Sequence, residues 1–384
     1  MFTKGINFKN FSKKKKNSKV NRLLIKILRE NNEVIKSLKT NYKNSFTKKK
    51  ISDLKKFNEV NVIGMGGSIL GSQAIHSFLS YKIKKNFIFI NNLEKRIVQK
   101  PKKKKLNLII SKSGNTLETI SNINVFIKRK DKNFFVTENR DNYLMNLAHK
   151  LKADVIHHNN FIGGRYSVLS EVGMLPAELM GLNSNKFKRL NYLIKNKSFI
   201  NSLVLNVSNI INLINQKKFN SVILNYDERS QDLFNWYQQL VAESLGKKNK
   251  GIFPIISLLP RDNHSLMQLY LDGPQKNFFT FFFVKDKSIQ NITSSNLLNS
   301  HLYLKGKSLS DISEAQYKAT QKVFEKKKIP FRNFYLKKRD EETLGELFTF
   351  FILETILLGM MIKVNPYDQP AVELIKKETK KKLV

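Results

Sequence analysis

Three charged or titratable residues lie in settings that suit proton transfer. Arg165 follows a pair of glycines in an otherwise apolar stretch, where a fixed charge is costly unless an anion faces it. Glu243 lies in a predicted helix, with Gln239 one turn earlier on the same face. His264 lies at a polar turn that opens another predicted helix. A carboxylate can remove a proton next to a carbonyl group, and a nearby cation can stabilise the oxygen that becomes charged.

Taken singly, each of these residues more often has a structural role. A glutamate in a polar helix is usually solvated, a lone histidine is usually structural, and an arginine after glycines often pairs with a buried carboxylate. Their presence together in one chain is what favours catalysis. A catalytic interpretation also needs a place for the substrate to bind, and two other segments supply a candidate.

The first of these segments is an apolar strand that runs into glycines. Residues 62–71 have the sequence Val-Ile-Gly-Met-Gly-Gly-Ser-Ile-Leu-Gly. Glycines such as Gly67 let the backbone approach a phosphate closely, and the residues that follow can open a helix whose free N–H groups face the anion. Ser68 would add a hydroxyl donor. Such a turn is often only a tight connection, so this motif alone leaves both interpretations open.

A second strand with the same design follows later in the chain. The apolar segment 106–110 is followed closely by Ser111, Ser113, Asn115 and Thr116. Capping of the next helix explains one or two of these residues but not readily four. Two such turns in one sheet can hold one phosphate group. The chain lacks a complete G-x-G-x-x-G, and no acidic residue closes the strand at 86–92, so a sugar phosphate fits better than a dinucleotide.

The elements that must position these residues alternate between strands and helices. We predict strands near 60–63, 86–90, 107–111 and 133–136, with helices such as 117–130 between them. The pattern restarts with a strand at 220–225, a helix that contains Glu243, a strand near 278–284 and a long helical C-terminal region. This alternation predicts an α/β fold of two mainly parallel sheets flanked by helices. The predicted divisions are a basic helical segment at 1–50, a first domain at 51–190 and a second at 191–384.

Composition narrows the possible classes of protein. A chain of 384 residues with 41% hydrophobic residues can bury a sizeable core. The chain has no cysteine, so disulfides, thiolate nucleophiles and cysteine metal sites are excluded. The N-terminus lacks a continuous apolar core followed by a cleavage site, so we expect no secretory signal. The apolar run 344–364 is interrupted by Glu346, Glu354 and Lys363, which favours a buried helix. We therefore expect a soluble, cytoplasmic protein.

A formal net charge of +39 would favour binding to nucleic acid or to an anionic membrane, so both classes of partner have to be considered. The charge comes mostly from lysine, in runs at 13–16, 48–50, 102–105 and 326–328. A nucleic-acid binder would be expected to interleave arginine and aromatic residues, and these runs favour solvated surface instead. We expect no nucleic-acid partner and no membrane partner. A basic field would, however, favour capture of a phosphate dianion.

The ordered set of motifs resembles the glucose-6-phosphate isomerases, also called phosphoglucose isomerases, in their bacterial type. The resemblance runs from about residue 55 to the C-terminus and rests on the segments 64–71, 111–116, 163–167, 242–247, 263–265 and 368–376. It implies two sugar-isomerase (SIS-type) domains that interconvert glucose 6-phosphate and fructose 6-phosphate through a cis-enediol, a step of glycolysis and gluconeogenesis. It implies neither a metal nor another cofactor.

The resemblance also implies roles for individual residues. The implied phosphate site combines hydroxyls and backbone N–H groups, from Gly67, Ser68, Ser111, Lys112, Ser113 and Thr116. Glu243 would move the proton between C1 and C2, and Arg165 would stabilise the enediolate. His264 and Lys376 would assist ring opening. Two further residues, Gln239 and Gln369, would contact the sugar or shape the site. In this family the histidine comes from the neighbouring subunit, so the resemblance implies an obligate homodimer.

Two alternatives remain open at this point. The segment 113–119 has the wording Ser-Gly-Asn-Thr-x-Glu-Thr, which is similar to that of bifunctional phosphoglucose/phosphomannose isomerases, whereas segments 163–167 and 368–373 favour the single-function group. Ile69 stands where many relatives have an aspartate. The other alternative is a sugar-phosphate sensor without catalysis. Such a sensor would lack Glu243 or His264 and carry a DNA-binding module, and residues 1–50 show no clear recognition helix.

Overall fold

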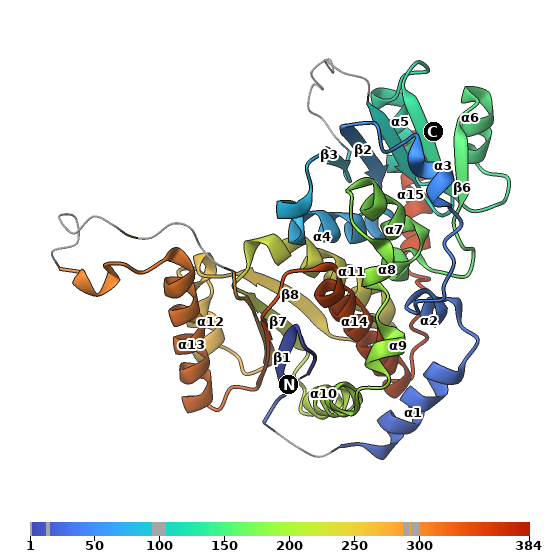
Figure 1. The fold of residues 1–384 in the computed structure, drawn as a ribbon. Helices are drawn as coiled ribbons and strands as arrows, with labels where there is room; N and C mark the ends of the chain where they lie inside the picture. The colour runs from blue at the N-terminus through green and yellow to red at the C-terminus, as the bar shows by residue number, and fades with distance from the viewer. Residues whose placement is uncertain (1, 13–15, 94–104, 287–291, 293–299) are drawn as a thin grey trace.

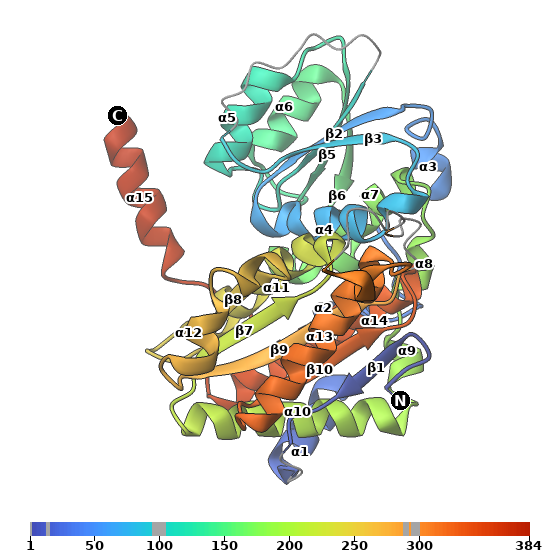
Figure 2. The same cartoon turned by 90° about the vertical axis from the view of Figure 1, so that its left-hand side faces the viewer.

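The computed structural model describes residues 2–12, 16–93, 105–286, 292 and 300–384. Two sheets lie in separate lobes, and helices α4 (Leu70–Phe78) and α11 (Gln231–Leu245) pack against each other between them (Figure 1, Figure 2). The lysine runs at 13–15 and 102–104 fall outside the described residues. Both sheets are mainly parallel and flanked by helices, as the alternating sequence pattern predicts, so the class is α/β.

The first sheet is entirely parallel within the described residues. Its strand order is β3-β2-β4-β5-β6. The strands are β2 (Glu59–Gly64), β3 (Asn86–Ile90), β4 (Leu106–Ile110), β5 (Lys132–Thr137) and β6 (Asp154–His157). Four of them agree with the predicted strands to within a residue or two, and the short β6 was not predicted. Because β2 and β4 are neighbours, with Gly64 paired to Ile110, the turns that follow them begin side by side.

The second sheet is parallel except for one edge strand. Its order is β1-β10-β9-β7-β8, and β1 runs antiparallel to β10. The strands are β1 (Ile6–Lys9), β7 (Asn220–Asn225), β8 (Phe253–Leu258), β9 (Asn277–Val284) and β10 (Phe331–Leu336). Strands β7 and β9 were predicted, whereas β10 lies in a region predicted to be helical. In β10 alternate residues are buried, which is the period of a strand rather than of a helix.

The N-terminal segment differs from the helical interpretation of residues 1–50. Residues 6–9 form β1, because Ile6 and Phe8 alternate with polar residues and Phe8 packs on Phe334 with ring centroids 4.5 Å apart. Three helices follow, α1 (Ser18–Arg29), α2 (Glu33–Ser37) and α3 (Lys48–Ser52). The apolar face of α1 packs against α10 (Lys197–Asn215) and α14 (Glu341–Met361). The first residues of the chain are therefore part of the second lobe.

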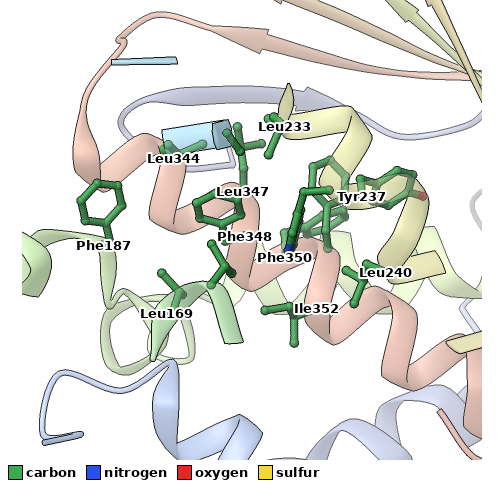
Figure 3. Packing of buried hydrophobic residues seen from close by; sticks show 14 of the residues in the cluster. Leu169, Phe187, Leu233, Tyr237, Leu240, Leu344, Leu347, Phe348, Phe350 and Ile352 are labelled. Carbon is green, nitrogen blue, oxygen red and sulfur yellow. The ribbon is translucent and has the colours of Figure 1, made fainter. Parts of the chain in front are cut away.

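Helix α14 is the centre of the second lobe. By length and composition it could cross a membrane, but 89% of its most apolar window is buried inside the fold. Phe348 packs on Trp236 of α11 with ring centroids 4.8 Å apart, and Figure 3 shows Leu347, Phe350 and Ile352 in the same cluster. The interpretation of this run as a buried helix agrees with the structure.

The remaining elements connect and cover the sheets. The other α-helices are α5 (Leu117–Phe126), α6 (Tyr143–Leu151), α7 (Glu171–Leu179), α8 (Ser184–Phe187), α9 (Leu190–Leu193), α12 (Met267–Asp272), α13 (Leu309–Lys326) and α15 (Val372–Leu383). The short 3₁₀ turns are η1 (Gly66–Ser68), η2 (Ser80–Lys82), η3 (Gly164–Leu169), η4 (Glu228–Ser230), η5 (Arg261–Asn263) and η6 (Leu302–Leu304). Helix α5 ends at Phe126, four residues before the predicted end.

Candidate active site

Two hydroxyl-bearing turns lie at the carboxyl edge of the first sheet. After β2 the chain turns at Gly66, whose φ of +54° favours glycine, and continues into the buried Ser68. After β4 the buried Ser111 lies with its Oγ 3.0 Å from Oγ1 of Thr116. The structure therefore brings the two groups of predicted phosphate ligands to adjacent strand ends. Open α/β sheets bind ligands at this edge.

Two further predicted phosphate ligands lie within the second turn. The Lys112 ammonium donates to the carbonyl oxygen of Asn160 at 2.8 Å and lies 3.3 Å from the Glu138 carboxylate. The ammonium of Lys112 is thus already paired. Its backbone N–H is the group that would bind a phosphate, as the resemblance implies. Ser113 is half-buried, and its Oγ accepts a hydrogen bond from the N–H of Asn115 at 3.3 Å.

A close backbone contact brings Arg165 to the first turn. A Cβ atom added at Gly67 would lie 2.1 Å from the carbonyl carbon of Gly164 and 2.4 Å from the nitrogen of Arg165. Only a glycine fits at this distance, because real Cβ atoms do not approach other atoms so closely. The glycine-rich turn and the Gly163-Gly164-Arg165 turn therefore pack directly on each other. This contact requires a glycine at Gly67, whereas a Cβ added at Gly164 would meet Gly67 at an ordinary 3.6 Å.

The Arg165 guanidinium is buried, with 2% of the residue exposed, and all of its five N–H donors have acceptors. The Nε donates to Oγ of Ser244 at 2.8 Å. The Nη1 donates to Oε2 of Glu243 at 3.1 Å and to Oε1 of Gln369. The Nη2 donates to the carbonyl oxygens of Pro366 at 2.8 Å and Asp368 at 3.0 Å. The candidate base is thus one of the groups that balance the buried charge.

Glu243 is the accessible member of this cluster. Its side chain is 29% exposed, and its Oε1 accepts from Nε2 of Gln239 at 2.8 Å, as their spacing on α11 predicts. Gln239 lies against the first turn, since a Cβ added at Gly66 would be 2.7 Å from its Nε2. Gln239 Oε1 is buried, and within the described residues it lacks a hydrogen-bond partner. Such an oxygen is suited to accept a hydroxyl of a bound molecule.

Residues 365–369, here called the strap, cross the site after α14. Two of their carbonyl oxygens accept from Arg165, and Pro366 also accepts from the Tyr166 hydroxyl at 2.9 Å. Gln369 is exposed on the strap. An oxygen of a bound sugar can reach Nη1 of Arg165 only by displacing one of its present acceptors, and Gln369 is an exposed one. The structure therefore brings Gln369 into the site with Arg165, Glu243 and Gln239.

The two residues implied in ring opening do not reach this cluster within one chain. His264 follows η5 and is exposed. Lys376 is exposed on α15, where it pairs with Glu373 at 2.7 Å. Figure 2 shows α15 extending away from both lobes, and each of its residues is at least partly exposed. A single chain thus brings together Glu243 and Arg165, the predicted base and cation, while both predicted ring-opening groups are exposed to solvent.

Several groups at the site carried no assignment from the sequence. Ser244 and Tyr166 adjoin Glu243 and Arg165 in the motifs, and their hydroxyl oxygens lie 2.8 Å apart beneath the guanidinium. Burial raises the pKa of Tyr166, so it remains a neutral hydrogen-bond donor. Their position next to recognised residues was the available signal. No sequence signal marks the strap carbonyls as acceptors, because every residue has a carbonyl group.

A buried polar cluster supports the turn that precedes Arg165. Glu171 accepts from the N–H of Asn159 at 2.6 Å and from the Tyr42 hydroxyl at 3.2 Å, and its burial raises its pKa. Lys188 is fully buried beside it, donates to the carbonyl oxygen of Tyr42 at 3.0 Å, and has its pKa lowered to about 8 by burial. This cluster ties the N-terminal segment to the first lobe. In the described part of the chain, no three histidine, aspartate or glutamate side chains are placed to hold a metal ion.

Known proteins match this chain over most of its length. The profile of the family described as Phosphoglucose isomerase matches residues 12–253. The glucose-6-phosphate isomerase of Methanocaldococcus jannaschii is 32% identical over 347 residues, which cover 85% of each sequence. The glucose-6-phosphate isomerase of Mycoplasmopsis pulmonis is 33% identical over 348 residues, which cover 82% of this chain and 80% of the relative.

Solved structures share the fold. A hypothetical protein from Thermus thermophilus has a TM-score of 0.83 at 22% identity, covering 96% of this chain and 94% of that one. A glucose-6-phosphate isomerase from Chlamydia trachomatis has a TM-score of 0.69 at 18% identity, covering 95% of this chain and 73% of that one. The predicted class, two sugar-isomerase domains with mainly parallel sheets, is confirmed. Because the family profile covers more than half of the sequence and relatives above 30% identity cover most of it, this chain belongs to the phosphoglucose isomerase family.

Proposed function

We propose that this protein reversibly isomerises glucose 6-phosphate and fructose 6-phosphate through a cis-enediol intermediate, a step of glycolysis and gluconeogenesis. The observation that carries this function is the buried Arg165 guanidinium beside the accessible Glu243 carboxylate, 3.1 Å apart, next to two hydroxyl-bearing turns. A phosphate at those turns places the sugar over the base and the cation.

The chemistry follows from this arrangement. The hydroxyls of Ser68, Ser111 and Thr116 and the nearby backbone N–H groups hold the phosphate. Glu243 takes the proton from C2 of the open-chain aldose and returns it to C1, and the reverse sequence forms the aldose. The charge that develops on oxygen in the enediolate lies beside Arg165. Because this guanidinium is already fixed and buried, little reorganisation accompanies the reaction.

Ring opening calls for groups that the single chain does not bring to Glu243. We propose that the protein is a homodimer and that His264 enters the site of the neighbouring subunit, where its imidazole exchanges a proton with the sugar. The exposed position of His264 and the exposed apolar residues Leu374 and Ile375 of α15, 68% and 69% exposed, support a second copy as a neighbour. Lys376 on the same helix is proposed to assist.

Conversion of fructose 6-phosphate, followed with a coupled glucose-6-phosphate dehydrogenase, tests the activity. We expect glucose 6-phosphate to form without added metal. Mannose 6-phosphate is assayed in parallel, because its turnover would move the protein to the bifunctional group. Binding of both sugar phosphates without turnover of either would contradict the proposed function and favour the sensing role.

Mixing two inactive variants tests the crossing of His264. In a mixture of Glu243→Gln and His264→Ala that has exchanged subunits, each heterodimer has one site with both native residues if His264 crosses. Random exchange then restores about a quarter of wild-type activity. If both residues act within one chain, every site in the mixture lacks one of them and activity stays at background.

We also propose that the protein works in the cytoplasm. Sugar phosphates are dianions that do not cross a bilayer unaided, so their metabolism is confined to the compartment in which they form. Cell fractionation with an assay of the isomerase activity tests this location. Activity that follows the membrane or exported fraction would contradict it.

A further inference from the structure

Lys247 lies two residues beyond the end of α11 and holds the strap. Its ammonium donates to the carbonyl oxygen of Asp368 at 2.6 Å, to Oδ1 of the same residue at 2.9 Å and to the carbonyl oxygen of Asn365. The Lys247 side chain is 11% exposed. An ammonium has three N–H donors, so each of them has an acceptor on the strap.

The opposite side of the strap contacts Arg165. The carbonyl oxygen of Asp368 accepts from both Lys247 and Nη2 of Arg165, and the neighbouring carbonyl of Pro366 accepts from the same Nη2. Lys247 and Arg165 therefore both donate hydrogen bonds to the backbone of the strap. The strap lies in the connection between α14 and α15, where Asn365 and Asp368 are exposed and Pro366 is buried.

We propose that Lys247 is a positioning residue for the isomerisation, which rests on the proposed function above. It fixes the strap, and the strap carbonyls fix the plane of the Arg165 guanidinium beside Glu243. A guanidinium donates in a rigid planar fork, so the position of its acceptors decides where its remaining donors point. The strap also carries Gln369 and leads into α15, so the same contact sets where the helix with Lys376 leaves the protein.

The charge on the strap supports this role. The hydrogen bond from Lys247 holds the pKa of the Asp368 carboxyl below its ordinary value, so this exposed carboxylate stays ionised opposite the ammonium. The Asp368 carboxylate also accepts from Nδ2 of Asn365 at 3.1 Å, which closes the strap on itself. The ion pair between Lys247 and Asp368 therefore holds the strap and does not involve the phosphate turns.

Lys247→Met, which keeps the aliphatic stem and removes the ammonium, is the main test. We expect kcat for fructose 6-phosphate to fall about 10- to 100-fold, since small misplacements of a catalytic group cost rates of this order. The KM and the inhibition constant of inorganic phosphate should change less than about threefold, because the phosphate turns are untouched. Lys250→Met is the matched control, because Lys250 lies on the same loop and donates to the carbonyl oxygen of Ile362 at the end of α14 instead of the strap. It should retain wild-type kcat.

Two further variants separate positioning from simple loss of structure. Asp368 is exposed, and Asp368→Asn should also lower kcat, but by a smaller factor than Lys247→Met. The double variant should have the same kcat as Lys247→Met alone. Lys247→Arg should restore part of the lost kcat. The proposal is overturned if Lys247→Met keeps wild-type kcat, or if it loses phosphate affinity and kcat together. Wild-type turnover of fructose 6-phosphate, measured alongside, tests the proposed function separately.

Discussion

Arg165 shows how one buried charge can serve both structure and chemistry. Its guanidinium takes acceptors from α11 and from the strap, while its backbone packs on the first glycine-rich turn. A buried cation is stable only where it is paired and hydrogen-bonded. Since one of its partners is the Glu243 carboxylate, the contacts that make burial possible also fix the cation beside the proposed base. Loss of Arg165 would therefore disturb folding as well as the reaction.

Glu243→Gln is expected to separate binding from turnover. The amide keeps the size of the side chain but cannot take the proton, so kcat for fructose 6-phosphate should fall about 10²- to 10⁴-fold. The inhibition constant of inorganic phosphate should stay near the wild-type value, because the phosphate turns are unchanged. Glu325→Gln, at an exposed glutamate paired with Lys9, is the control. Retained turnover in Glu243→Gln would assign the base to another residue.

The sequence identified the side chains of the candidate site better than it identified their contacts. Arg165, Glu243 and Gln239 were recognised from residue type and local setting. Nothing in the spacing of Arg165 and Glu243 could show that they meet at 3.1 Å, because that distance depends on the packing of two lobes. Of the strap, only Asp368 and Gln369 belong to the recognised motif 368–376, since the backbone carbonyl acceptors of the strap leave no trace in residue types.

At the scale of elements, the contact between two turns joins the proposed phosphate site to the proposed catalytic pair, Arg165 and Glu243. Gly67 follows β2 in the first sheet, whereas Gly164 begins the turn that leads into α7. Their backbones touch without any side chain between them. The spacing of the first glycine-rich turn from Arg165 is thus set by main-chain contact. Such contacts are stiffer than those between long side chains.

Gly67→Ala is expected to disturb both functions of the site. The added Cβ would overlap the backbone at Gly164 and Arg165, and forced overpacking of this kind costs about 1–3 kcal/mol of the free energy of unfolding. The KM for fructose 6-phosphate should rise and kcat should fall. Gly163→Ala is the matched control, because its Cβ would meet only a ring carbon of Tyr166 at an ordinary 3.7 Å. Equal effects of the two substitutions would contradict the contact.

The buried strands β2, β4 and β7 were easier to predict than the edge strand β1. The strands β2, β4 and β7 are rich in Val, Ile and Leu and are buried over all or all but one of their residues, which is the pattern of parallel strands buried on both faces. The edge strand β1 is short and lies in a basic segment. Its pairing with β10 is a long-range contact that local pattern cannot reveal. The position of α15 away from the lobes is likewise not predictable, because a helical pattern gives the helix but not its place in the fold.

The buried Lys188 makes stability depend on pH. Burial lowers its pKa to about 8 in the folded protein, whereas an unfolded lysine titrates near 10.4, so between these values the unfolded chain binds the extra proton. The free energy of unfolding should therefore rise with pH over this window, by about 3 kcal/mol from this group. Urea unfolding of wild type and Lys188→Met at pH 7 to 10 measures the difference. Lys186→Met, at an exposed lysine, should keep the wild-type slope.

At the scale of the whole molecule, the net charge of +39 acts on the approach of substrate. A positive protein field attracts a phosphate dianion, and salt screens this attraction over about 10 Å at 0.1 M. We expect kcat/KM for fructose 6-phosphate to fall as ionic strength rises, with kcat changing less. A kcat/KM that stays flat between low and high salt would contradict electrostatic steering by the lysine excess.

The antiparallel pairing of β1 with β10 has a consequence for synthesis. A ribosome adds Leu336, in β10, 330 residues after its β1 partner Ile6. At about 5–20 residues per second, tens of seconds separate the two. During that time Ile6 and Phe8 have no native neighbour strand, and the second sheet stays open at this side. The pairing that completes this side of the second sheet therefore forms long after β1 itself has been synthesised.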